Sequence, residues 1–389
     1  MRSAIVPSEP SRTGAGKVRL GDVATYVNGY AFKPNDWTCD GKEIIRIQDL
    51  TGSSNQPNHF AGTIPGKYLV KNGDVLISWS ASIGVYVWGR DDAWLNQHIF
   101  KVVFDKVHVD NRYFVHQVSV VLKDAAGSAH GCTMQHLTKP VFDALPFFLP
   151  PLPTQQRIAD ELDQLCALKK NAEDRLAILD QIVKSRFVEM FGTIQNSRYD
   201  VVSLDNLCEF IKDGTHQTPT YTDDKEHGYK FLSSKDVTSG SIDWTKIKYI
   251  PEELHKELHK RIAPHRSDIL LAKNGTTGIA ALVDTDEVFD IYVSLALLRF
   301  KPGNDVHYLL HAINSTDTKH QFDASLKGVG VPNLHLGEIK KTKIIVPPLA
   351  PQREFAAFVA EVDKSKLTLR ETVATLDQLY RAKLQEYFG

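Results

Sequence analysis

The sequence has few cysteines and no long apolar segment. Its 389 residues include four cysteines, at positions 39, 132, 166 and 208, and no two of them form a C-x-x-C pair. This usage predicts reduced thiols in a cytoplasmic protein. No apolar run is long enough to span a membrane. Residues 1–17 lack the apolar core of a signal peptide and are expected to form a disordered tail.

The sequence also lacks the excess of positive charge that is typical of nucleic-acid-binding proteins. Its formal net charge is −1 at pH 7. Residues 1–149 carry 15 Lys and Arg against 13 Asp and Glu, and residues 193–346 carry 19 against 21. This balance argues against a chain that holds DNA tightly by itself.

No catalytic motif in the sequence is complete. Residues 11–17 resemble a phosphate-binding loop, but Ser11 replaces the first glycine and Val18 replaces the Ser or Thr that would bind magnesium. Both Pro-Pro pairs precede leucine, whereas an adenine methyltransferase needs an aromatic residue there. His255 and His259 can share one helix face, but without a Glu or Cys partner we expect a solvated face. The sequence therefore predicts no catalytic residue, no metal site and no cofactor in this chain.

A long internal repeat is the strongest positive feature. Residues 150–192 and 347–389 align without a gap at a constant offset of 197. Both segments begin with Pro-Pro-Leu-x-x-Gln and end with Phe-Gly, and apolar residues in both follow a heptad pattern. Proline before and glycine after such a segment are typical of helix boundaries. Each segment is therefore predicted to be one long helix.

The two predicted helices have matching apolar seams. Their polar interruptions match as well, because Lys169 corresponds to Lys366, and a polar seam residue costs stability but fixes register. Two such helices most simply pack as an antiparallel coiled coil. The residues expected in this spacer and partner-docking seam are Leu162, Leu165, Lys169, Leu176, Leu179, Val183, Val359, Val362, Lys366, Leu369, Val373, Leu376 and Tyr380.

The segments that precede the two helices also match each other. Residues 47–49 pair with 234–236 at an offset of 187, and residues 73–78 pair with 267–272 at 194. An offset that only rises is expected of two homologous domains with insertions in the second. The sequence thus predicts an α/β (α+β) protein ordered as domain 18–149, helix 150–192, domain 193–346 and helix 347–389.

Short apolar runs predict the strands of these mixed α/β domains. We expect strands at 44–47, 75–78, 99–104, 230–233, 269–272 and 293–300. Helices are expected near 111–123 and 306–314.

Polar loops recur at equivalent places in the two domains. Residues 213–221 combine turn-forming glycine and proline with hydrogen-bonding side chains, and residues 28–33 occupy the same place in the first domain. Such side chains read base edges in the DNA major groove. Each loop alone is equally well explained as a surface turn, but their recurrence favours a binding face. The candidates are Tyr30, Lys33, Ser78, Trp79, Ser80, Ser82, Gln97, His98, Thr215, His216, Gln217, Thr218, Tyr221, Lys273, Asn274, Thr276 and Thr277.

From Val18 to Gly389 the chain resembles the specificity subunit of type I restriction-modification systems. The repeated Pro-Pro-Leu-x-x-Gln start, the Phe-Gly end and the loops DGTHQTPTY and GDVLISWSASIG carry the resemblance. It implies a pseudo-twofold arrangement in which each domain is a target recognition domain reading half of a bipartite sequence in double-stranded DNA. One departure is that Thr154 and Pro351 stand where the family usually has glutamate.

The resemblance also implies partners. The helices would space the two domains and dock two methyltransferase subunits, with two restriction and translocase subunits as optional further partners. S-adenosylmethionine, ATP and magnesium would bind those subunits, and the complex would methylate adenine and cleave unmodified DNA. The alternative is a scaffold or inhibitor that binds methyltransferase subunits but does not read DNA.

Overall fold

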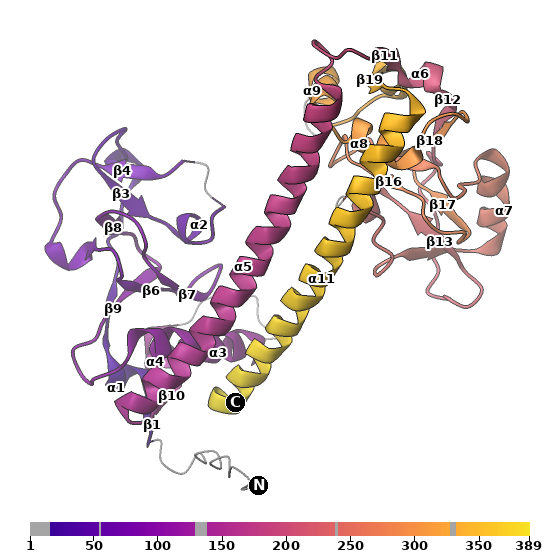
Figure 1. Cartoon of the computed structure of the whole chain (residues 1–389). Coiled ribbons are helices and arrows are strands. Elements are labelled where there is room, and N and C mark those ends of the chain that lie inside the picture. The colour runs from indigo at the N-terminus through magenta and orange to yellow at the C-terminus, as the bar shows by residue number, and fades with distance from the viewer. Residues whose placement is uncertain (1–15, 54–55, 129–137, 238–239, 327–331) are drawn as a thin grey trace, which may run out of the picture. The chain divides into compact units, whose positions relative to one another are not determined.

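The computed structural model describes residues 16–53, 56–128, 138–237, 240–326 and 332–389. The chain divides into two compact units, Met1–Glu173 with Arg370–Gly389 and Asp174–Leu369. Each unit contains one α/β domain and about half of each of two 40-residue helices, α5 (Leu152–Phe191) and α11 (Leu349–Phe388) (Figure 1). Both predicted long helices are therefore present. No helix in the described ranges is long and apolar enough to cross a membrane.

The first domain is built on two four-stranded sheets, with strand orders β2-β9-β6-β7 and β4-β3-β8-β5. The first sheet is antiparallel, and β3 and β8 are parallel in the second. The elements are β1 (Gly16–Arg19), α1 (Leu20–Val23), β2 (Thr25–Asn28), η2 (Pro34–Asp36), β3 (Lys42–Ile45), α2 (Ile47–Leu50), β4 (Asn58–Phe60), η3 (Gly66–Tyr68), β5 (Leu69–Val70), β6 (Val75–Ser78), β7 (Gly84–Val87), β8 (Ala93–Leu95), β9 (Ile99–Val103), α3 (Asn111–Ser128), α4 (Lys139–Asp143) and β10 (Pro146–Leu149).

The second domain repeats this topology with the sheets β12-β18-β15-β16 and β14-β13-β17, in which β13 and β17 are again parallel. Its elements are β11 (Asp200–Ser203), α6 (Leu204–Leu207), β12 (Cys208–Asp213), β13 (Tyr229–Leu232), η4 (Ser234–Val237), β14 (Lys248–Ile250), α7 (Glu252–Arg261), β15 (Ile269–Ala272), β16 (Ala280–Leu282), β17 (Phe289–Ile291), β18 (Leu295–Phe300), α8 (Val306–Ile313), α9 (Thr316–Ser325), α10 (Leu336–Lys341) and β19 (Lys343–Val346).

The first and last strands of each domain pair with each other. β1 is antiparallel to β10, and β11 is antiparallel to β19, so each domain is closed just before its long helix begins. Gly16 and Lys17 belong to β1 and pair with Leu149 and Phe148. The expected tail of residues 1–17 is therefore wrong at these two positions, and residues 1–15 lie outside the described residues.

The predicted strands all occur, with ends within two residues of the predicted ones. The run at 44–47 is displaced to β3 because the backbone N–H of Arg46 donates to the Asp49 carboxylate at 2.9 Å and starts the short helix α2. The predicted helices at 111–123 and 306–314 are α3 and α8, and α3 extends to Ser128. The rise in the repeat offset from 187 to 194 coincides with the helix α7 of the second domain.

A buried glutamine fixes the start of each long helix to its domain. Gln155 is 1% exposed, donates to the Pro150 carbonyl at 2.7 Å and accepts from the backbone N–H of Asp110 at 2.9 Å. Asp110 in turn caps α3 through the N–H groups of Arg112 and Tyr113. These bonds join the start of α5, the end of β10 and the start of α3.

The repeat forms the same connection in the second unit. Gln352 is 1% exposed, donates to the Pro347 carbonyl at 2.7 Å and accepts from the N–H of Asp305 at 2.8 Å. Asp305 caps α8 through His307 and Tyr308. Both Gln side chains are therefore structural, which explains their recurrence in the sequence.

The end of each long helix packs on the domain that immediately precedes the other long helix in the chain. Phe388, at the end of α11, lies 5.5 Å from Tyr113 between ring centroids, and Phe191, at the end of α5, lies 4.9 Å from Tyr308. Both phenylalanines are buried. The recurrent Phe-Gly thus supplies a core aromatic to each unit.

The two long helices are antiparallel in both units. In the first, Lys169 contacts Asp377 at 2.7 Å and Glu161 contacts Lys383 at 3.0 Å. In the second, Lys366, the counterpart of Lys169, contacts Asp180 at 2.7 Å. Arg186, the counterpart of Lys383, contacts Glu354 at 3.3 Å. All thirteen predicted seam residues are buried or half-buried, so the predicted antiparallel pairing is confirmed.

We predict that Gln352→Ala destabilises the second unit by about 1–3 kcal/mol, because the part-buried N–H of Asp305 loses its acceptor. Urea unfolding of the full chain, combined with hydrogen exchange at the Asp305 amide, measures this loss. Gln378→Ala on the exposed surface of the same helix is the matched control and should change stability by less than about 0.5 kcal/mol. Equal effects of the two substitutions would contradict the structural role of Gln352.

Candidate nucleic-acid interface

In the second domain, the polar loops leave one edge of the sheet β12-β18-β15-β16. Asp213 ends β12 opposite Ala296, and Ala272 ends β15 opposite Leu295, near the start of β18. β12 and β15 are both antiparallel to β18, which lies between them, so they run in the same direction. Their carboxyl ends therefore meet at the same edge of the sheet. Residues 214–221 and 273–278 therefore begin side by side.

Backbone hydrogen bonds and a close approach hold the 214–221 loop against the segment after β17. Thr215 donates to the Ile291 carbonyl at 3.1 Å, and Val293 donates to the Thr215 carbonyl at 2.9 Å. A Cβ atom on Gly214 would lie 1.9 Å from the carbonyl oxygen of Ile291. Only glycine fits this position, so Gly214 is required by the backbone path.

A buried carboxylate organises the charged residues of the same loop. Asp213 is 6% exposed and lies 3.3 Å from the ammonium group of Lys273, 3.3 Å from the Arg261 guanidinium and 3.2 Å from Nε2 of His216. Arg261 also donates to the Gly214 carbonyl at 3.0 Å. A buried charge is tolerated only when it is paired, and Asp213 meets that condition by tying α7, β15 and the loop together.

Several predicted residues of the second domain do present their side chains to solvent. Gln217 is exposed, while its backbone N–H donates to the Thr215 hydroxyl at 3.2 Å and fixes the turn. Tyr221 is 43% exposed, and the Lys248 ammonium lies 4.1 Å from its ring centroid. Burial raises the pKa of Tyr221 above its ordinary value, so its hydroxyl is neutral at pH 7. The exposed candidates are His216, Gln217, Thr218, Tyr221 and Thr276, and Asn274 is half-buried.

The first domain brings its predicted loops together in the same way. The Trp79 indole donates to the Asn28 side chain at 3.3 Å, the Trp79 backbone N–H donates to His98 at 3.3 Å, and the Gln97 N–H donates to Tyr30 at 2.9 Å. A Cβ atom on Gly29 would lie 1.9 Å from the Asn96 carbonyl oxygen. Gly29 is thus the counterpart of Gly214. Lys33 and Ser82 are exposed, and Tyr30, Trp79, Gln97 and His98 are half-buried.

Five predicted interface residues are buried, which corrects the expectation that their side chains face a ligand. They lie at strand ends or inside turns, where they hold the loops from within, as Thr215 does for Gln217 and Lys273 for Asp213. These five are Ser78, Ser80, Thr215, Lys273 and Thr277. Lys248 and Arg261 were not predicted at this loop, because both reach it from other elements and no local sequence motif connects them to it.

The pair His255 and His259 does not lie on a solvated face, so that expectation is wrong. His255 is 8% exposed, and its Nδ1 lies 2.7 Å from Oδ2 of Asp290, which is 1% exposed. The sequence showed no partner nearby because Asp290 lies on β17, far along the chain. The one indication in the sequence is that the apolar run 288–291 contains an acidic residue, Asp290.

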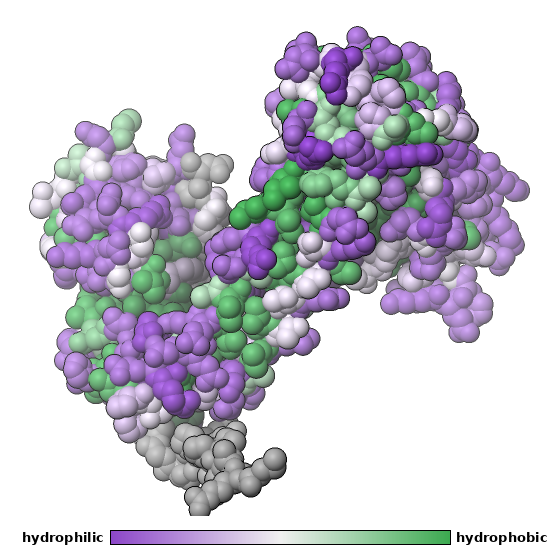
Figure 2. Space-filling model, in the orientation of Figure 1, coloured by the Kyte–Doolittle hydropathy of each residue, from purple (hydrophilic) through white to green (hydrophobic). Residues whose placement is uncertain are grey.

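An exposed apolar groove lies along α5 in the second unit. Ile178 is 57% and Ile182 42% exposed, and they line the groove together with Phe358 of α11. Figure 2 shows hydrophobic surface along this helix. Polar residues such as Gln181 and Arg186 complete the lining, so the groove presents apolar side chains within a polar rim.

Two domains of one topology, each with polar loops at the same sheet edge and followed by a long helix, define a duplicated recognition protein. The chain belongs to the type I restriction modification DNA specificity domain family, whose model matches residues 14–178 and 196–378. It is therefore a specificity subunit with two recognition domains.

Known relatives are similar along nearly the whole chain. The chain is 24% identical over 407 residues to the EcoBI specificity subunit of Escherichia coli, covering 96% of this chain and 85% of that protein. It is 22% identical over 382 residues to the MjaVIII specificity subunit of Methanocaldococcus jannaschii, covering 89% and 85%.

Two solved structures share the fold. One comes from work on the complex assembly and conformational transition of a type I R-M system, with a TM-score of 0.58, 17% identity, and coverage of 98% of this chain and 99% of that one. The other is the type I S subunit from M. genitalium, with a TM-score of 0.56, 13% identity and 98% coverage of both chains.

Proposed function

We propose that this specificity subunit is non-catalytic and that each α/β domain reads one half of a bipartite target in double-stranded DNA. The observation that carries the proposal is the recurrence of the loop set at one sheet edge in both domains. Gly29 and Gly214 permit the same close backbone approach in the two domains. The exposed donors and acceptors beyond these glycines are of the types that read base edges.

The near-zero net charge of the chain is consistent with a division of labour between subunits. Phosphate contacts supply most of the affinity for DNA, while base contacts supply the sequence preference. With a net charge of −1, this chain places base-reading side chains, and its partners supply most of the phosphate contacts.

We assign methyltransferase docking to the exposed apolar surface of the long helices. Ile182 and its repeat counterpart Leu379 are 42% and 44% exposed, so each unit presents an apolar side chain at this repeat position. Two methyltransferase subunits would bind there, and two restriction and translocase subunits would join them. S-adenosylmethionine, ATP and magnesium would bind those subunits, and the complex would work in the cytoplasm on adenine methylation and cleavage of unmodified DNA.

The first test is selection of bound sequences from random DNA by the complex of this chain with its methyltransferase subunits. We expect one bipartite sequence to be enriched. Replacing residues 200–345 by the equivalent domain of a relative should change one half of that sequence and leave the other intact. A complex that enriches no sequence would identify the chain as a scaffold, and a swap that alters both halves would overturn the one-domain-per-half assignment.

A second prediction concerns Gln217, whose exposed amide can form a bidentate pair with adenine. We expect Gln217→Ala to cost about 1–3 kcal/mol at one base position of a single half-site. Competition binding of the assembled complex against single-base variants at two salt concentrations measures this. Gln164→Ala on the exposed face of α5 is the control. A uniform loss with a reduced salt slope would indicate a phosphate contact, and an unchanged preference would place Gln217 outside the interface.

A third prediction separates docking from folding with two neighbouring residues. Ile182→Asp should leave the chain folded, because Ile182 is exposed, but should remove one methyltransferase subunit from the purified complex. The double variant Ile182→Asp, Leu379→Asp should remove both. Val183→Asp should instead unfold the second unit, because Val183 is 5% exposed in its core.

The control for docking is Val288→Asp, an exposed apolar residue of the same unit that lies outside the groove. It should keep full stoichiometry. Retention of both methyltransferase subunits by the double variant would show that the helices dock them elsewhere.

A further inference from the structure

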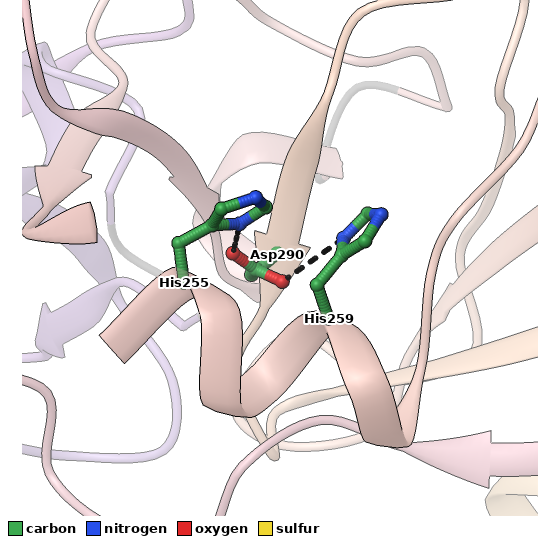
Figure 3. Close-up of side chains that lie close together, drawn as sticks. All are labelled: His255, His259 and Asp290. Carbon is green, nitrogen blue, oxygen red and sulfur yellow. Dashed lines mark hydrogen bonds and ion pairs between the residues drawn. The ribbon is translucent and has the colours of Figure 1, made fainter. Parts of the chain in front are cut away.

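Three side chains of the kinds that bind metal ions converge between α7 and β17 in the second domain. Helix α7 carries His255 and His259 one turn apart, and the carboxylate of Asp290 on β17 lies between their rings (Figure 3). Nδ1 of His255 is 2.7 Å from Oδ2 of Asp290, and Nδ1 of His259 is 3.5 Å from Oδ1. Donor atoms of the three residues all lie within 4.8 Å of one another.

A simple His–Asp pair explains only half of this cluster. Oδ2 of Asp290 is hydrogen-bonded to His255, but the buried Oδ1 and Nδ1 of His259 make only a long 3.5 Å contact with each other and no hydrogen bond. A desolvated carboxylate with one unsatisfied oxygen is costly unless a cation compensates for it.

We propose that His255, His259 and Asp290 bind one divalent transition-metal ion of the Zn²⁺ type. This site lies beyond the DNA-reading function proposed above. Imidazole nitrogens and a carboxylate oxygen suit such ions, whereas calcium and magnesium prefer all-oxygen sites. A tetrahedral zinc ion with bonds of about 2.0–2.1 Å separates its ligands by roughly 3.3 Å. Nδ1 of His259 lies 3.5 Å from Oδ1, close to that value, whereas the 2.7 Å contact of His255 with Oδ2 is a hydrogen bond that the ion would replace.

The cluster borders solvent on one side. The His259 side chain is 33% exposed, so solvent reaches the cluster from that side. The ring of Tyr229 stacks on His255 with centroids 3.6 Å apart and holds its plane. Three protein ligands with one position open to water are a common zinc arrangement.

The metal would stabilise the candidate DNA-reading loop. It would join α7 to β17. Arg261 at the end of α7 contacts Asp213 and Gly214, and Ile291 at the end of β17 accepts from Thr215. The first domain has the short η3 helix between β4 and β5, where the second domain carries α7. The proposed metal site therefore belongs to the second domain, and it is the one such group in the part of the chain that the structure describes.

Metal uptake by the full chain, without a polyhistidine tag, tests the proposal. After chelator treatment and dialysis against Zn²⁺, elemental analysis should find about one equivalent per chain, and Co²⁺ should give the visible absorption of a tetrahedral site. His259→Ala and Asp290→Asn should each weaken binding at least about 10-fold. Asp290→Asn preserves the shape of the side chain, and His259 is partly exposed, so at least one variant should fold.

The matched control is His227→Ala, which removes an exposed histidine that pairs with Asp224 at 2.9 Å in the same domain. It should bind metal as the wild type does. Thermal melting of each metal-free variant identifies any that fails to fold. Failure to take up stoichiometric metal, or uptake unchanged in a folded His259→Ala or Asp290→Asn variant, would overturn the site. These measurements need neither DNA nor partners, so their outcome is independent of the proposed function.

Discussion

The structure depends on a buried side-chain amide at the start of each long helix. Gln155 and Gln352 are almost wholly buried, and each must satisfy both ends of its amide inside the protein. Each does so by accepting from the N–H of an aspartate that caps a domain helix and donating to the carbonyl of the proline before the long helix. A helix of 40 residues is thus fixed in direction where it leaves its domain. Thr154 and Pro351 stand where the family usually has glutamate, but this glutamine contact needs no acidic side chain beside it.

The fixed direction of each helix matters because the far end of the other long helix packs into the core of the same domain. Phe388 packs on Tyr113 in one unit, and Phe191 packs on Tyr308 in the other. Along the helices, the seam lysines Lys169 and Lys366 are neutralised by Asp377 and Asp180. Since a polar seam residue is tolerated only in one register, these pairs set the helix pairing that the aromatic contacts complete.

Features that repeat along the sequence were predictable, and features made by long-range contacts were not. The constant offset predicted both helices and their seam, and the loop recurrence predicted which segments meet at the sheet edge. Burial of individual loop residues was missed because it depends on partners such as Asp213 with Lys273, which are distant in sequence. The burial of His255 was missed for the same reason, because its partner Asp290 lies 35 residues away in an apolar strand.

The loops separate the residues that fix their shape from those that face solvent. In the second domain, Gly214, Thr215 and Asp213 make the buried contacts, while Gln217 contributes only its backbone to them and leaves its amide exposed. The stability of the loop and the chemistry that it presents therefore lie on different residues. Under the proposed function, exposed positions can change the bases that are read at little cost in stability, whereas the buried positions are constrained by the sheet edge itself.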